Sequence, residues 1–199
     1  MHLTRFPGAL IFVLCLAVAD CGRATHGDMT DITGVMPSLA FSMIRANDDA
    51  PVGAANYRGK AVLLYFGYTH CPDECPTTLA HLATTLKQLG QSANSVRVLF
   101  VTVDPERDSI PVLKTYVRSF GPQIDALRGS PNAVATLARR YRVLYTVTAA
   151  SPGGPYSVMH SDSVFMFDGR GQARFVTTST DDSEALAQRI RQLLADGWY

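Results

Sequence analysis

Residues 61–76 read AVLLYFGYTHCPDECP, and their pattern indicates how the domain is built. The first six residues, 61–66, are continuously apolar, as expected for a strand that is covered on both faces of a sheet. Beyond it, leucines recur at helical spacing and stop at a glycine suited to end a helix: Leu79, Leu82, Leu86, Leu89 and Gly90. The sequence therefore predicts that a buried strand passes into a helix across Cys71 and Cys75.

The same alternation of strands and amphipathic helices continues along the chain. Ser130 is placed to cap a helix, with Pro131 in its first turn, and Asp168-Gly169-Arg170-Gly171 is typical of a hairpin turn. Residues 146–156, which contain Gly153 and Gly154, read as an irregular insertion. The pattern predicts a single α/β sandwich. Its remaining predicted elements are strands over 96–103, 164–167 and 173–177 and helices over 108–120, 130–143 and 182–194.

The composition suits one domain and argues against nucleic acid as a partner. Hydrophobic residues make up 47% of the 199 residues, enough for a sizeable core. Lys and Arg number 18 against 17 Asp and Glu, so no basic excess is present to neutralise a run of phosphates. The 4 cysteines are too few for a disulfide scaffold, so their positions matter more than their number.

The N-terminus reads as an export signal over residues 1–20. A positively charged start precedes an apolar run at 8–19, which is shorter than the roughly 20 residues of a bilayer span. Two ways of processing this signal stay open: cleavage after Ala19, or lipidation of Cys21. Asp20 is an unusual residue immediately before a lipidated cysteine. Residues 21–36 read as a flexible tether to a domain over 37–199. The expected location is the bacterial periplasm, with the inner membrane contacted only through this N-terminal anchor.

Cys71 and Cys75 lie where the first buried strand passes into its helix. Ligands gather beyond the carboxyl ends of strands in such sheets, and a helix N-terminus favours a thiolate over a thiol. An offset of four residues in a helical turn places both sulfurs on one face. The pair therefore suits either a shared metal ion or a disulfide, and a metal ion requires a further ligand.

Four histidines are candidates for that further ligand. His26 falls in the predicted tether, His81 lies on the far face of the helix, and His70 adjoins Cys71, so its side chain points away from the sulfur. His160 would lie at the cysteine edge if the strand over 164–167 ran antiparallel to the first strand. On the residues alone, an ordinary loop histidine is the favoured interpretation.

With these features in place, the chain resembles the Sco/SenC family of copper-binding assembly proteins for cytochrome c oxidase. The likeness covers residues 61–194 and rests on three segments: YFGYTHCPDECP at 65–76, VTVDPERD at 101–108 and YSVMHS at 156–161. The resemblance implies a thioredoxin-like three-layer sandwich. An N-terminal hairpin near residues 38–46 and an insertion before the C-terminal hairpin would be added to it.

The same resemblance implies that Cys71, Cys75 and His160 bind one copper ion. Two thiolates are soft donors suited to Cu(I), and an added imidazole permits Cu(II), so the donor set could hold either oxidation state. Zinc prefers a fourth ligand. A disulfide between Cys71 and Cys75 would remove both soft donors, so oxidised protein is expected to lose copper and keep its fold, with Gly153 and Gly154 permitting motion around the site.

The chain departs from the family pattern beside His160. Family members usually carry Asp or Asn where this chain has Met159, which we interpret as a packing side chain, with weak thioether ligation as the alternative. Asp104 is expected either to form hydrogen bonds near the site or to cap the loop before Asp108. Ser161-Asp162-Ser163 stands where thioredoxins carry a cis-proline, which argues against general dithiol exchange.

The resemblance implies a metallochaperone rather than an enzyme. We expect a monomer that delivers copper to the dinuclear copper site of cytochrome c oxidase subunit II, with another periplasmic copper chaperone or a thioredoxin-like reductase as further partners. Two alternatives stay open: a thiol-disulfide oxidoreductase that reduces partner cysteines through Cys71 and Cys75, and a copper or redox sensor.

Overall fold

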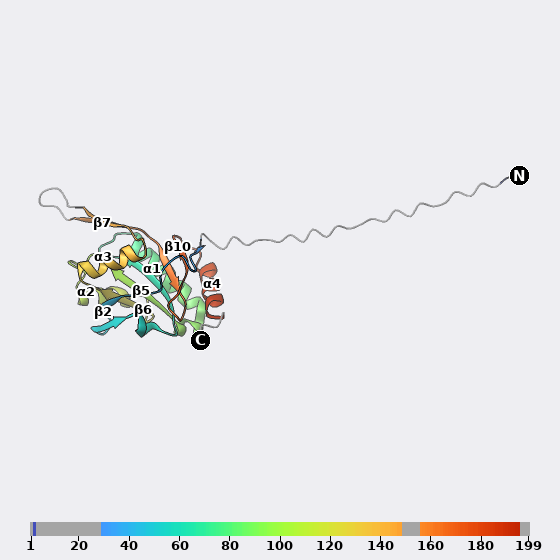
Figure 1. Ribbon diagram of the computed structural model, residues 1–199, viewed down its shortest axis with the longest axis horizontal. Coiled ribbons are helices and arrows are strands. Elements are labelled where there is room, and N and C mark those ends of the chain that lie inside the picture. The colour runs from blue at the N-terminus through green and yellow to red at the C-terminus, as the bar shows by residue number, and fades with distance from the viewer. Residues whose placement is uncertain (1, 3–28, 149–155, 196–199) are drawn as a thin grey trace.

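The computed structural model describes His2, residues 29–148 and residues 156–195 (Figure 1). The predicted export signal, Cys21 and the glycines at 153 and 154 lie outside these residues, apart from His2. The elements are, in chain order, β1 (Met29–Asp31), β2 (Ser42–Arg45), β3 (Ala50–Gly53), η1 (Ala54–Tyr57), β4 (Ala61–Gly67), α1 (Glu74–Leu89), η2 (Gly90–Ser95), β5 (Val96–Thr102), α2 (Ile110–Arg118), β6 (Ile124–Arg128), α3 (Pro131–Arg140), β7 (Tyr145–Thr148), β8 (Ser157–His160), β9 (Val164–Phe167), β10 (Ala173–Thr177) and α4 (Ser183–Ala195).

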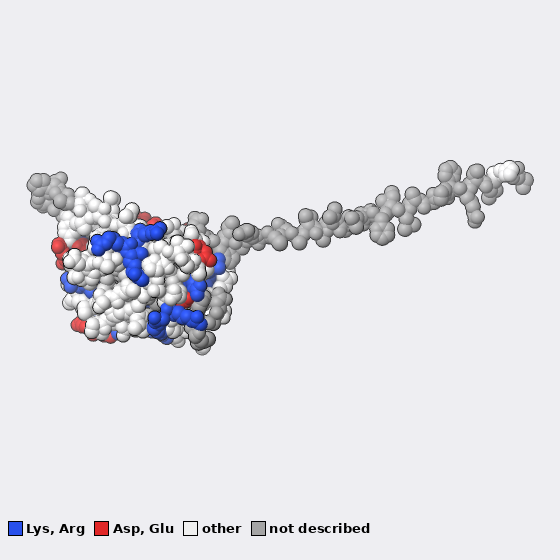
Figure 2. Space-filling model, viewed as in Figure 1, with Lys and Arg blue, Asp and Glu red and all other residues white. Residues whose placement is uncertain are grey.

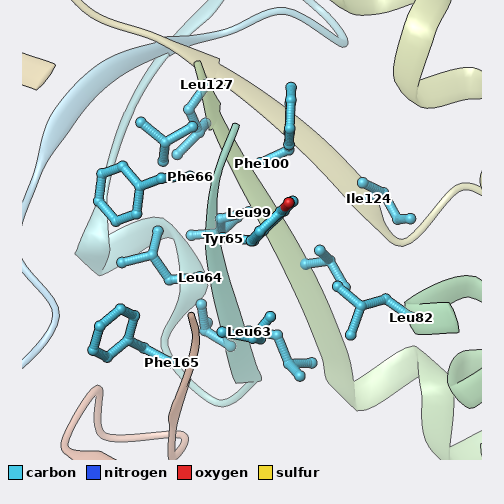
Figure 3. Packing of buried hydrophobic residues seen from close by; sticks show 14 of the residues in the cluster. Leu63, Leu64, Tyr65, Phe66, Leu82, Leu99, Phe100, Ile124, Leu127 and Phe165 are labelled. Atoms are coloured by element: carbon cyan, nitrogen blue, oxygen red, sulfur yellow. The ribbon is translucent and has the colours of Figure 1, made fainter. Parts of the chain in front are cut away.

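One mixed sheet forms the centre of the described chain, with the strand order β1-β10-β9-β4-β5-β6-β2-β3. β4, β5 and β6 run parallel, with Leu64 opposite Leu99, and β9 pairs antiparallel with β4, with Leu64 opposite Phe165. All seven residues of β4 are buried, because both faces of the sheet are covered. Figure 3 shows Leu64 and Phe66 on one side of β4 and Leu63 and Tyr65 on the other.

Helices cover the two faces of this sheet. Leu82 of α1 lies on the Tyr65 side (Figure 3), and α4 packs against α1. Tyr116 of α2 reaches the same side, since its ring lies 5.5 Å from that of Phe100, which in turn lies 6.1 Å from Tyr65. On the other side, Tyr141 at the end of α3 contacts Phe165, with 5.7 Å between ring centroids. The three-layer thioredoxin-like sandwich is thus confirmed.

Two helices begin or end elsewhere than predicted, and β6 is one of the strands that were not predicted. α2 begins at Ile110 rather than Asp108, because the Asp108 carboxylate accepts hydrogen bonds from the Thr69 and Thr102 hydroxyls in the loop before the helix. α3 begins as predicted, since the amide of Ala133 donates to the Ser130 hydroxyl at 3.2 Å, but it ends at Arg140 rather than residue 143. β6 was missed because its Asp125 and Arg128 interrupt a short apolar run.

The N-terminal part of the domain differs from the prediction in two respects. The hairpin is formed by β2 and β3 over residues 42–53 rather than 38–46, because Met43 pairs with Val52. β1 pairs with β10, with Thr30 opposite Val176, and Ile32 is buried. Residues 29–36 therefore belong to the folded domain rather than to a flexible tether.

A second, two-stranded sheet is formed by β7, which overlaps the start of the predicted irregular insertion, and β8, which follows its end. β7 pairs antiparallel with β8, with Tyr145 opposite His160 and Val147 opposite Val158, and Figure 1 shows β7 projecting from the body of the molecule. These strands were missed because each has four residues and most of their side chains are exposed, so no apolar run marks them. Within the described residues, no helix is long and apolar enough to cross a membrane.

Candidate metal centre

The cysteine pair lies at the carboxyl end of β4, where α1 begins. Cys71 is in the loop between these elements and Cys75 is in the first turn of α1. Gly67 permits the close approach of helix and strand, because a Cβ atom there would lie 2.9 Å from Cys75 Sγ and 2.6 Å from Phe100 Cε2. Any larger residue at position 67 would displace the sulfur or the ring.

Three side chains distant in sequence converge here. The sulfurs of Cys71 and Cys75 and a ring nitrogen of His160 all lie within 4.8 Å of one another. Cys75 Sγ is 3.1 Å from His160 Nε2, and the Cys75 amide donates to Cys71 Sγ at 3.3 Å. Such spacing lets all three atoms contact one ion, given metal-ligand bonds of about 2.0–2.3 Å. β9 runs antiparallel to β4, which is the arrangement that was required for His160 to lie at the cysteine edge.

The orientation of His160 leaves Nε2 free to act as a ligand. Its Nδ1 lies 3.0 Å from the carbonyl oxygen of Ser161, and a carbonyl can only accept, so the proton is on Nδ1. The Nε2 lone pair therefore faces the sulfurs. The rings of Tyr65 and Tyr68 contact the imidazole, at centroid distances of 6.1 and 5.8 Å and interplanar angles of 72° and 89°.

The two sulfurs differ in burial. Cys75 is fully buried, and this burial raises the pKa of its thiol to about 12, with the neighbouring Cys71 sulfur adding to the effect. For Cys75, burial therefore outweighs the helix N-terminus that was expected to favour the thiolate. Cys71 is half-buried. In the reduced site without metal, the Cys75 thiol donates to His160 Nε2, and binding of a metal ion releases that proton.

A hollow opens the site to solvent beside Cys71. Met159 lies on its wall and is 67% exposed, so the interpretation of this residue as a packing side chain is wrong. Glu74 is exposed, as expected of a solvated side chain. The residues that line the hollow are Tyr68, Cys71, Glu74, Val158, Met159, His160 and Asp162.

The other histidines lie apart from the three-residue group. His70 is exposed, with Nδ1 3.1 Å from the Thr69 hydroxyl, and His81 Nδ1 is 3.3 Å from the Thr180 hydroxyl. His26 lies outside the described residues. Of the histidines that the structure describes, only His160 lies beside the two cysteines.

Asp104 reaches the site indirectly. Its carboxylate accepts from the Tyr156 hydroxyl at 2.5 Å and from Arg107 Nε, and its backbone carbonyl accepts from the Asp108 amide. Sequence reasoning did not find the contribution of Arg107 or Tyr156. A signal for Arg107 was present in the acidic and basic residues of 104–108, which follow a strand that is apolar apart from Arg97 and Thr102.

Comparisons with known proteins agree with this geometry. The family model described as SCO1/SenC matches residues 26–195. The chain belongs to the SCO1/SenC family. Among solved SCO structures, copper-bound ScoI of Arabidopsis thaliana is 32% identical, with a TM-score of 0.73 over 80% of this chain and 99% of that one. Copper-bound yeast Sco1 is 31% identical, with a TM-score of 0.73 over 81% and 91%.

Curated SCO relatives are mitochondrial and bacterial. The mitochondrial SCO2 homologue of Bos taurus is 36% identical over 143 residues, which are 71% of this chain and 54% of that protein. The SCO2-like protein of Rickettsia typhi is 31% identical over 67% of this chain and 66% of its own length. The chain spans about half the length of the first of these relatives.

Proposed function

We propose that the protein is an extracytoplasmic copper chaperone that binds one copper ion through Cys71, Cys75 and His160. It delivers the ion to the dinuclear copper site of cytochrome c oxidase subunit II and is held at the bacterial inner membrane by its N-terminus. The observation that carries the proposal is the convergence of two sulfurs and one imidazole nitrogen within 4.8 Å. The copper bound in the Arabidopsis and yeast structures supports the choice of metal.

The donor set favours copper over other first-row metals. Thiolate sulfur suits Cu(I), and imidazole extends the range to Cu(II), so the ion can change oxidation state without leaving the site. Structural zinc sites have four protein ligands, whereas the described residues that gather here are three.

Delivery requires that a partner reach the bound ion. Cys71 and His160 are half-buried and line the solvent-facing hollow, whereas Cys75 lies behind them. An incoming ligand of the partner would therefore replace Cys71 or His160 first and Cys75 last.

Copper titration of the full chain tests the binding step. A background with Cys15 and Cys21 changed to Ser leaves Cys71 and Cys75 as the remaining thiols. We expect one copper per chain, lost in C71A and C75A and weakened in H160A, with His81→Ala as the histidine control outside the site. Unchanged affinity in all three site variants would refute the proposal.

Delivery is tested in cells that lack the chromosomal gene. Wild-type protein is expected to restore the copper content of subunit II, and C71A/C75A is not, at equal protein level. Restoration of subunit II copper by C71A/C75A would separate oxidase assembly from this site.

A second candidate function is reduction of partner disulfides. The observation that favours it is the half-buried Cys71 sulfur beside Cys75, whose amide donates to it at 3.3 Å. The Cys71 thiolate would attack a partner disulfide and release one partner thiolate; the Cys75 thiolate would then displace the second, so two electrons pass to the partner and Cys71–Cys75 becomes a disulfide. His160→Ala separates the functions, since exchange would survive and Cu(II) binding would weaken.

A further inference from the structure

We propose that Asp104 and Asp108 are positioning residues that set the two halves of the metal site against each other. Asp108 holds the loop that carries Cys71, and Asp104 holds the hairpin that carries His160. The inference rests on the proposed copper site and deepens it, because it assigns the geometry of that site to one short segment, residues 102–108, at the end of β5.

Asp108 anchors the cysteine loop. Its carboxylate is fully buried and accepts from the Thr69 hydroxyl at 2.5 Å and from the Thr69 amide at 3.1 Å. It also accepts from the Thr102 hydroxyl at 2.5 Å, which ties the loop to the last residue of β5. Thr69 lies two residues before Cys71, so these bonds determine where the loop delivers the Cys71 sulfur.

Asp104 anchors the histidine hairpin through Tyr156, the residue before β8. The Tyr156 hydroxyl donates to Asp104 at 2.5 Å. Arg107 holds the same residue from the other side: it pairs with Asp104, its guanidinium lies 3.9 Å from the Tyr156 ring centroid, and its Nη1 donates to the Tyr156 carbonyl at 3.2 Å. Tyr156 is therefore held at its hydroxyl, its ring and its backbone.

Arg107 also connects this clamp to the imidazole. Its guanidinium lies 5.7 Å from the Tyr68 ring centroid, and the edge of Tyr68 meets the His160 ring. Arg107 thus contacts aromatic rings on both the cysteine side and the histidine side of the site.

The clamp matters because the main sheet holds His160 only through β9, which begins four residues later at Val164. Within the described chain, β8 pairs with β7 in a separate sheet and shares no ladder with the eight-stranded one. The pairing of β9 with β4 brings this segment to the cysteine edge, but no strand pairing of the main sheet fixes where the imidazole itself lies. The two carboxylates are held rigidly together, since the Asp104 amide donates to the Thr102 hydroxyl and the Asp108 amide donates to the Asp104 carbonyl, both at 3.0 Å.

Asp104→Asn tests the histidine half. In the reduced full chain with Cys15 and Cys21 changed to Ser, we expect the imidazole-nitrogen coupling in the electron paramagnetic resonance spectrum of bound Cu(II) to disappear. Cu(II) affinity should fall about tenfold, the size of effect usual for residues that support metal ligands. Cu(I) affinity should stay within about threefold, because both thiolates remain in place.

Asp108→Asn tests the cysteine half and should give the opposite pattern. Cu(I) affinity is expected to fall about tenfold as Cys71 moves, with nitrogen coupling retained. Asp125→Asn is the matched control, since Asp125 is also a buried carboxylate that accepts from a tyrosine hydroxyl, that of Tyr57 at 3.0 Å. It should leave both copper signatures unchanged.

Milder variants keep the test decisive if a carboxylate replacement fails to fold. Tyr156→Phe and Thr69→Val each remove one donor to Asp104 or Asp108, and each should reproduce the pattern of its aspartate variant in weaker form. If D104N folds and keeps wild-type copper signatures, the role proposed for Asp104 is wrong; if D104N does not fold, the same result in Tyr156→Phe overturns it. D108N, with Thr69→Val as its substitute, tests the role proposed for Asp108 in the same way. Absence of nitrogen coupling in the unsubstituted protein would instead contradict the copper site itself.

Discussion

Gly67 shows how one residue without a side chain makes this site feasible. It ends β4, and the space that its Cβ atom would fill is occupied by the Cys75 sulfur and the Phe100 ring. The strand can therefore bring its carboxyl end directly against the first turn of α1. The sulfur that results is fully buried, close to His160 and shielded from bulk solvent.

Gly67→Ala should damage both stability and metal binding. The added methyl would overlap with the Phe100 ring and the Cys75 sulfur, which we expect to cost about 1–3 kcal/mol of unfolding free energy and to lower copper affinity. Gly90→Ala is the control: its φ of 56° makes alanine strained by about 1–2 kcal/mol, but nothing lies within 4 Å of the new methyl. Urea unfolding and copper titration of both variants check this. Equal copper affinities in the two would contradict the role of Gly67.

Replacing either of two buried tyrosines by phenylalanine should change stability in opposite directions. The Tyr65 hydroxyl is buried without a hydrogen-bond partner among the described residues, whereas the Tyr57 hydroxyl donates to Asp125 at 3.0 Å. Tyr65→Phe should therefore stabilise the reduced, metal-free protein by about 1 kcal/mol, and Tyr57→Phe should destabilise it by about 1–3 kcal/mol. Urea unfolding of the two variants measures this difference, and a loss of stability in Tyr65→Phe would show that its hydroxyl is bonded in solution.

The helices differ in how their first turns are capped. Ser130 accepts from the Ala133 amide and caps α3, whereas Ser109 at the start of α2 makes no such side-chain bond. Ser130→Ala is expected to cost about 1 kcal/mol of unfolding free energy, and Ser109→Ala to change it by less than about 0.5 kcal/mol. Thermal unfolding distinguishes them, and neither should alter copper binding. An equal loss in both variants would mean that the cap at Ser130 contributes nothing specific.

The strongest elements could be predicted from the sequence, and the weakest could not. β4 and α1 were clear because a buried parallel strand is apolar throughout and a helix against it repeats its leucines. β7 and β8 were missed because a hairpin that projects from the body carries polar residues on both strands. β1 was missed because its three residues contribute edge hydrogen bonds rather than buried side chains.

The candidate site was predicted in part for the same reason. The cysteines follow from the strand and helix that carry them, but His160 needed the family resemblance, because its place depends on packing between segments 85 residues apart. Arg107 and Tyr156 were not found at all. Their role depends on a contact across 49 residues that no local pattern reveals.

The molecule as a whole gathers the chemistry of three distant segments at one edge of its sheet. β4 brings the cysteines there, the segment after β5 supplies Asp104 and Asp108, and β8 brings His160. The described surface in Figure 2 shows small groups of Lys and Arg separated by wide neutral areas, in line with a net charge of +1 for the chain.

Oxidation should empty the site without unfolding the domain. A Cys71–Cys75 disulfide removes both sulfur donors, and a loop this short restricts the unfolded chain little, so the fold should change slightly in stability. We expect oxidised full chain, with Cys15 and Cys21 changed to Ser, to lose at least about 100-fold in Cu(I) affinity while its far-ultraviolet circular dichroism stays the same. Retention of one tightly bound Cu(I) after complete oxidation would contradict this coupling.

X-ray absorption at the copper edge shows whether two cysteines and one histidine form a single copper site. In the copper-loaded full chain with Cys15 and Cys21 changed to Ser, we expect two sulfur ligands at about 2.3 Å and a nitrogen ligand at about 2.0 Å. His160→Ala should remove the imidazole scattering, and C71A one sulfur. Copper ligands without sulfur, or the same ligands in wild type, C71A and His160→Ala, would contradict a shared site of Cys71, Cys75 and His160.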